Sequence, residues 1–159
     1  MTPEQAVQAL DALLDETVSA LRPRLRCWDG WPRSVELAAG PDDGAPSYAV
    51  ATRDRYVMTR VSPAKYGALL GITERTWQAR GYTITSVNPH QPAMFAATGA
   101  GYGLCVLFGA AGNITFQATV GPIPVIRDRD PFGTYVPEPT LPNGNLDVIP
   151  RYDDPFWSS

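Results

Sequence analysis

The sequence has few of the side chains on which most chemistry depends. Its 159 residues include one histidine and two cysteines, and charged residues make up 18% of the chain. No P-loop, HExxH, CxxC or GxSxG motif is present. A single histidine, His90 in the turn-like NPHQP, cannot supply a metal cluster, and nothing in the sequence assembles it with a nucleophile. We therefore expect no metal, no cofactor and no enzyme activity.

Basic charge and long apolar runs are also scarce. The formal net charge is −3, and the basic residues are twelve arginines and Lys65, a bias that we attribute to a GC-rich coding genome. A chain without a basic stripe is a poor nucleic-acid binder. The N-terminus has no positive segment followed by an apolar run, and no apolar window reaches about 18 residues. We expect a cytoplasmic protein with no membrane span.

The two cysteines leave their pairing open. Cys27 and Cys105 could join in an oxidising compartment, but two thiols give no disulfide framework to interpret. Alternation within YGLCVLF favours a buried, inert Cys105. A hydrolase or transferase would need Asp54, Glu74 or His90 to converge in one cleft, and we rank this class last.

Helix signals are clear at two places. Thr2 is a predicted N-cap with Pro3 at the first helical position, and apolar residues at three- and four-residue steps predict a helix that ends near Arg22. Ser62 and Pro63 repeat the same start signal, followed by the amphipathic run that Gly81 ends.

Strand signals follow the second helix. Four short runs separated by turns predict a β-meander: YTITSVN, AMFAATG, YGLCVLF and ITFQATV. Between 24 and 61 the pattern is weaker because glycine and proline interrupt it. We predict a short strand at 34–38, a loop at 40–46, and a strand or bent hairpin at 48–61 with its bend at Arg53–Arg55.

The composition changes at Gly121, because half of the sixteen prolines fall in the last 39 residues. The segment keeps too many apolar residues for an inert linker, so it either packs on its own domain, docks on a partner, or is disordered. The candidate partner-binding residues are Phe132, Tyr135, Tyr152, Phe156 and Trp157. The predicted organisation is an α+β domain at 1–120, with amphipathic helices packed on one face of a small antiparallel sheet, and an extended proline-rich C-terminal arm at 121–159.

Three sequence runs carry a family resemblance. These are W-x-x-R-G-Y-x-I at Trp77–Ile84, G-Y-G-L at Gly101–Leu104, and G-x-I-T-F-Q-A-T from Gly112. Over about 48–120 the chain resembles small actinobacterial proteins, many of them lipoprotein-like and others uncharacterised and cytoplasmic. The resemblance implies an α+β domain and no catalytic residues. The chain departs from the lipoprotein-like members because it lacks a lipobox cysteine.

These observations favour a non-enzymatic protein-binding module, such as an immunity protein or a secretion-associated adaptor or chaperone. The alternative is a small-ligand-binding domain with an aromatic pocket between helix and sheet. Its lining would be Trp28, Trp31, Tyr66 and Trp77. An exposed strand edge or the apolar arm could also exchange between two copies, so a homodimer is a further expectation.

Overall fold

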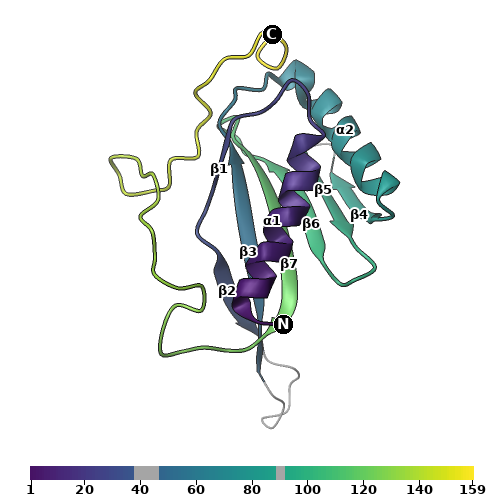
Figure 1. Ribbon diagram of the computed structural model, residues 1–159. Coiled ribbons are helices and arrows are strands. Elements are labelled where there is room, and N and C mark those ends of the chain that lie inside the picture. The colour runs from purple at the N-terminus through teal and green to yellow at the C-terminus, as the bar shows by residue number, and fades with distance from the viewer. Residues whose placement is uncertain (38–46, 89–91) are drawn as a thin grey trace.

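The computed structural model of the chain describes residues 1–37, 47–88 and 92–159 (Figure 1). It confirms the α+β class with an antiparallel sheet. The predicted loop at 40–46, the last residue of the predicted strand at 34–38, and His90 lie outside the described residues. In chain order the elements are α1 (Pro3–Ser19), β1 (Cys27–Asp29), β2 (Arg33–Leu37), β3 (Tyr48–Val57), a 3₁₀ turn η1 (Pro63–Lys65), α2 (Tyr66–Ala79), β4 (Thr83–Asn88), β5 (Ala93–Ala97), β6 (Gly103–Phe108) and β7 (Ile114–Ile123).

The strands form one seven-stranded sheet in the order β1-β3-β7-β6-β5-β4, with β2 beside β1 on the same side of β3. Each pairing is antiparallel. The predicted meander is therefore the run β4 to β7, and the turns between its last strands use glycines with positive φ, Gly101 and Gly112. The sheet is larger than predicted because β7 pairs with the ten-residue β3 from the first half of the chain.

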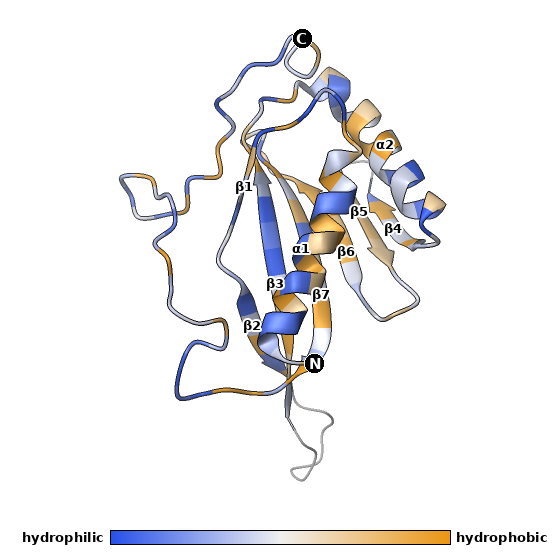
Figure 2. Ribbon diagram, in the orientation of Figure 1, coloured by the Kyte–Doolittle hydropathy of each residue, from blue (hydrophilic) through white to orange (hydrophobic). Residues whose placement is uncertain are grey.

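The predicted bend at Arg53–Arg55 is wrong, because β3 is one continuous strand through these residues. Figure 2 shows the middle of β3 as hydrophilic although α1 lies across it. The reason is ion pairing: Arg53 Nε lies 2.9 Å from Asp11 Oδ1 and Arg55 Nη1 lies 2.7 Å from Asp15 Oδ1, and both acids are on α1. Charge in this strand therefore binds the helix to the sheet and does not mark a turn.

The helix starts differ from each other. Thr2 and Gln5 form the reciprocal capping box, which satisfies two backbone donors of α1, and the helix ends at Ser19, three residues before the predicted end. Ser62 precedes the 3₁₀ turn but makes no side-chain cap. Its hydroxyl instead donates to the carbonyl oxygen of Ser159 at 2.8 Å, so it helps to hold the C-terminal residue.

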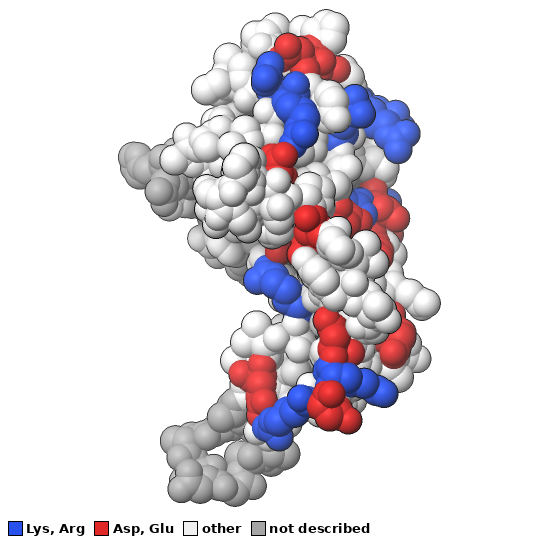
Figure 3. All heavy atoms as spheres, turned by 90° about the vertical axis from the view of Figure 1, so that its left-hand side faces the viewer, with Lys and Arg blue, Asp and Glu red and all other residues white. Residues whose placement is uncertain are grey.

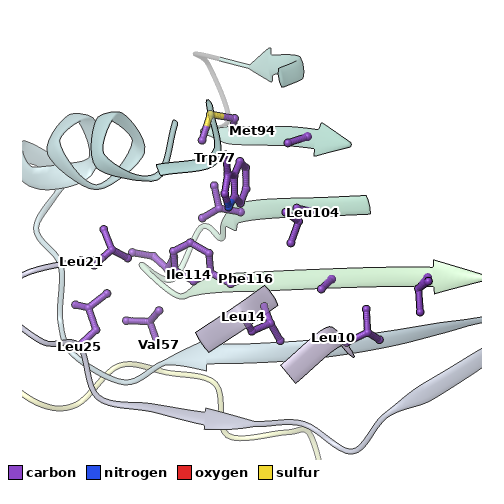
Figure 4. Packing of buried hydrophobic residues seen from close by; sticks show 14 of the residues in the cluster. Leu10, Leu14, Leu21, Leu25, Val57, Trp77, Met94, Leu104, Ile114 and Phe116 are labelled. Carbon is purple, nitrogen blue, oxygen red and sulfur yellow. The ribbon is translucent and has the colours of Figure 1, made fainter. Parts of the chain in front are cut away.

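The hydrophobic core lies between the helices and the sheet (Figure 4). Leu10 and Leu14 come from α1, Trp77 from α2, and Phe116 from β7, and each is at most 1% exposed. The helices also meet directly, because the buried indole nitrogen of Trp77 donates to Thr17 Oγ1 on α1 at 2.9 Å. Both helices thus contribute to one core.

Residues 124–159 form no helix or strand beyond isolated bridges. In Figure 1 they leave the end of β7, pass outside β1 and β2, and finish near the start of α2. Trp157, the third residue from the end of the sequence, is fully buried in the core cluster. The last segment is therefore tied to the rest of the chain by a core side chain.

Candidate binding surfaces

Two of the four predicted ligand-binding aromatics have other partners. Trp77 is a core residue whose one polar atom is bonded to Thr17. Tyr66, at the start of α2, has its ring centroid 4.5 Å from that of Phe108 at the end of β6. Both contacts are typical of packing between a helix and a sheet.

Trp28 lies in β1, and Trp31 follows it two residues after the strand ends. The ring of Trp28 lies 4.7 Å from Tyr56, and its indole nitrogen donates to the carbonyl oxygen of Asp147 at 3.1 Å. The indole nitrogen of Trp31 donates to the Asp130 carboxylate, and its backbone nitrogen donates to Glu138 Oε2, both at 2.9 Å. Each of these two predicted residues thus holds a different part of the C-terminal segment, and no contact between them places them in one pocket among the described residues.

The predicted partner-binding residues divide into buried and exposed members. Trp157 is fully buried, Phe132 is half-buried against the core, and Tyr135 is more than half exposed. Phe156 packs edge-on against Trp157 and carries Lys65 Nζ 4.3 Å above its ring. The guanidinium of Arg26 lies 3.5 Å above the ring of Tyr152. The exposed surface of this set is therefore mostly that of Tyr135, Tyr152 and Phe156.

A polar cluster lies on the sheet face opposite the helices, in the row that joins β3, β7 and β6. Asp54 is 6% exposed. Its carboxylate accepts hydrogen bonds from Arg33 Nη2 at 2.5 Å and Gln117 Nε2 at 2.7 Å, and Tyr56 Oη lies 3.5 Å away. Cys105 Sγ lies 3.7 Å from Gln117 Oε1. The buried charge is thus fully surrounded by donors, as a stable buried carboxylate requires.

Protonation in this cluster is shifted toward the neutral forms. Burial, with a smaller contribution from the Asp54 carboxylate, raises the pKa of Cys105 to about 11 and the pKa of Tyr56 to about 12. Burial likewise raises the pKa of Cys27 to about 11. Thiols with such values stay protonated near neutral pH and are weak nucleophiles. Both cysteines are free, and Cys105 is buried as predicted.

The three acid–base candidates of the sequence are not brought into one cleft within the described residues. Asp54 lies on the face of the sheet opposite the helices, and Glu74 lies on α2. His90 falls outside the described part of the chain. Among the described residues no group of three or more histidine, cysteine or acidic side chains could hold a metal ion, and none of the described helices is long and apolar enough to cross a membrane.

A cavity of about 610 Å³ lies between the end of α1 and β1. Trp28 is the one predicted aromatic in its wall, which is lined by Asp15, Val18, Ser19, Arg22, Arg24, Leu25, Cys27, Trp28, Asp29 and Arg55. Another cavity that Trp28 lines, of about 240 Å³, has Pro139, Arg151 and Tyr152 of the C-terminal segment in its wall. A third, of about 410 Å³, lies between Tyr48 and Pro122.

The two edges of the sheet differ. At one edge, β1 and its flanking residues contact 130–152, and Glu36 of β2 pairs with Arg127. At the other edge, β4 pairs with β5 alone among the described strands, and five of its six residues are exposed. Its sequence, TITSVN, contains no charged residue and no proline. The sequence signal for this edge was its composition, which predicted the strand but not its position in the sheet.

Comparison of the chain with protein-family models, with curated proteins and with solved structures found no match in any of the three. The resemblance to small actinobacterial proteins stays a prediction.

Proposed function

We propose that this protein is a non-enzymatic protein-binding module that receives an extended segment of a second protein along the outer edge of β4. The single observation that supports this most strongly is that β4 pairs with β5 alone among the described strands and carries no charged residue. Immunity proteins and secretion-associated adaptors or chaperones are the roles that this binding mode suits.

The physical argument starts from backbone hydrogen bonding. An edge strand presents a row of unpaired N–H and C=O groups, and proteins normally protect such an edge with lysine, other charges, proline or a covering segment. β2 at the opposite side carries Arg33 and Glu36 and follows Pro32. β4 has none of these residues, and Thr83, Thr85 and Val87 are β-branched residues that favour strands.

One feature of β4 limits where a partner strand would pair. The register against β5 shifts between Ile84 and Ser86, so the regular part of the strand runs from Ser86 to Asn88 beyond an irregularity at Thr85. Val87, in the regular part, is 54% exposed and is the largest side chain available there. Because β4 is uncharged, its partner is an extended segment with uncharged side chains, bound mainly through its backbone.

A pair of matched substitutions tests the proposal. Val87→Lys adds a charge to the β4 edge, and Val35→Lys makes the same change on β2, where the valine is 51% exposed. In affinity capture from cells of the source organism, the partner recovered by the unaltered chain should fall at least about tenfold with Val87→Lys and stay unchanged with Val35→Lys. Equal recovery with both variants contradicts the proposal.

A second copy of the chain is another occupant that the edge would accept. Sedimentation of the purified protein separates the two cases, because pairing between two β4 strands gives a dimer that Val87→Lys dissociates. In that outcome the strand edge binds as proposed but its occupant is the chain itself.

A small-ligand-binding function is the second candidate. The cavity of about 610 Å³ beside Trp28 favours it, because this volume lies within the usual range of roughly 300–1,000 Å³ for small-molecule sites. Its wall combines apolar side chains with several charged ones, which is the composition that orients a bound molecule.

A further inference from the structure

The cavity between α1 and β1 has a charge pattern that specifies a class of ligand. Arg22, Arg24 and Arg55 supply three positive charges to its wall, and Asp15 and Asp29 supply two negative ones. The wall therefore carries an excess of one positive charge in a chain whose formal net charge is −3. A local excess of this sign attracts an anion.

Arg55 is already neutralised and serves as a fixed part of the wall. Its Nε and Nη2 atoms donate to both carboxylate oxygens of Asp29, at 2.6 and 3.0 Å, and its Nη1 atom donates to Asp15 at 2.7 Å. A guanidinium held in this forked geometry has little freedom to turn toward a ligand. Asp15 and Asp29 both bond to Arg55, so they do not neutralise Arg22 and Arg24.

Arg22 and Arg24 are the arginines available to a ligand. Neither has a carboxylate within ion-pair distance among the described residues, whereas Arg60 pairs with Asp153 and Arg151 with Asp147. Figure 3 shows basic side chains, with acidic side chains next to them, at the upper end of the side of the molecule that faces the viewer. The sequence carries the signal as RPRLR, three arginines in five residues, which we had attributed to codon bias.

Apart from Ser19, the uncharged part of the wall is apolar. Leu25 is buried, Val18 and Cys27 are half-buried, and the Trp28 ring is fixed by its bond to Asp147. A ligand that fills this cavity must therefore bring an apolar or aromatic body along with its charge.

We propose that this cavity binds a small organic monoanion, a carboxylate with an aromatic or apolar body, whose charge meets Arg22 and Arg24 and whose body packs against Leu25 and Trp28. A monoanion matches the single excess positive charge. A second negative charge on the ligand would exceed this excess, and the negative end of the α1 dipole at Ser19 and the carboxylate of Asp15 in the same wall would oppose it. The inference rests on the small-ligand-binding function above and gives that site its ligand class.

Titration with two probes of one shape tests the ligand class. 3-Phenylpropionate carries the charge, and 3-phenylpropanol has the same body without it. In NMR titrations of the full chain, the acid should shift the Trp28 indole N–H signal and bind at least about tenfold more tightly than the alcohol.

Matched double variants locate the charge recognition. Arg22→Gln with Arg24→Gln should weaken binding of the acid by about tenfold or more and leave the alcohol unchanged. Arg75→Gln with Arg129→Gln removes the same charge from arginines outside the cavity and should change neither. Equal weakening by both double variants overturns the proposal, because the effect would then be one of net charge.

The remaining outcomes separate the ligand class from the function. If the alcohol binds as tightly as the acid, the anion proposal fails and the small-ligand function stands. If neither probe shifts the Trp28 signal at millimolar concentration, both fail.

Discussion

The indole nitrogen of Trp157 donates a hydrogen bond to the carbonyl oxygen of Pro23 at 2.6 Å, across 134 residues of sequence. The contact joins the turn after α1 to the last turn of the C-terminal segment. Asp154 supports it by accepting hydrogen bonds from the backbone nitrogens of Phe156 and Trp157. A residue predicted to bind a partner thus occupies a site in the chain's own core.

Replacing Trp157 should therefore unfold the protein more easily. Trp157→Ala removes a fully buried indole and should lower the free energy of unfolding by about 3–5 kcal/mol. Trp157→Phe, which loses chiefly the hydrogen bond and part of the ring, should cost less. Urea denaturation measures both, and Val136→Ala, at a 63% exposed position of the same segment, is the control. A loss below about 1 kcal/mol for Trp157→Ala would show that the segment is not part of the core.

The Asp54 cluster should contribute to stability through its donors. Gln117→Leu removes the Nε2 donor from a carboxylate that is 6% exposed, which should cost about 1.5–3 kcal/mol because the bond is to a charged group. Thr115→Val, two residues away on the same face of β7, should change the free energy of unfolding by less than about 0.5 kcal/mol. If the two variants are equally stable, the Asp54–Gln117 bond has no net role.

The two thiols, one buried and one half-buried, should make stability depend on alkaline pH. Burial raises the pKa of both Cys27 and Cys105 from 9.0 to about 11. Between these values the unfolded chain releases protons that the folded chain keeps. The free energy of unfolding therefore falls as pH rises from about 9 to about 11. Below pH 9 the contribution of the two thiols to this free energy is complete.

Denaturation at a series of pH values tests this dependence. The variant with Cys27→Ala and Cys105→Ala should show a shallower fall, and the part that remains includes the tyrosines whose pKa is also raised, Tyr56, Tyr82 and Tyr135. An unchanged slope in the double variant would assign the whole dependence to other groups.

The sequence predicted best those elements whose signals are local. The capping box at Thr2 and Gln5 fixes the start of α1 by bonds between residues three apart, and the turns at Gly101 and Gly112 need only their own backbone freedom. β1 escaped prediction because Cys27–Asp29 is three residues long and exists by pairing with Val57–Arg55 of β3.

The errors have one physical cause, which is compensation by residues far away in sequence. Arg53 and Arg55 suggest a bend until Asp11 and Asp15 of α1 are placed beside them. The sequence predicts Ser62 as a helix cap, but in the structure its hydroxyl bonds to Ser159. The candidate binding surfaces could not be predicted for the same reason. The position of β4 at an edge depends on the strand order of the whole sheet, and the cavity depends on where the RPRLR segment lies relative to α1 and β1.

Hydrogen exchange of the captured complex tests the strand-addition proposal most directly. Addition of a partner strand to β4 should slow amide exchange within Thr83–Asn88 relative to the free chain, because outward N–H groups gain acceptors, while amides of 127–157 exchange at the same rate in both. Slowing confined to 127–157, with β4 unchanged, would contradict the account and make the C-terminal segment the docking element.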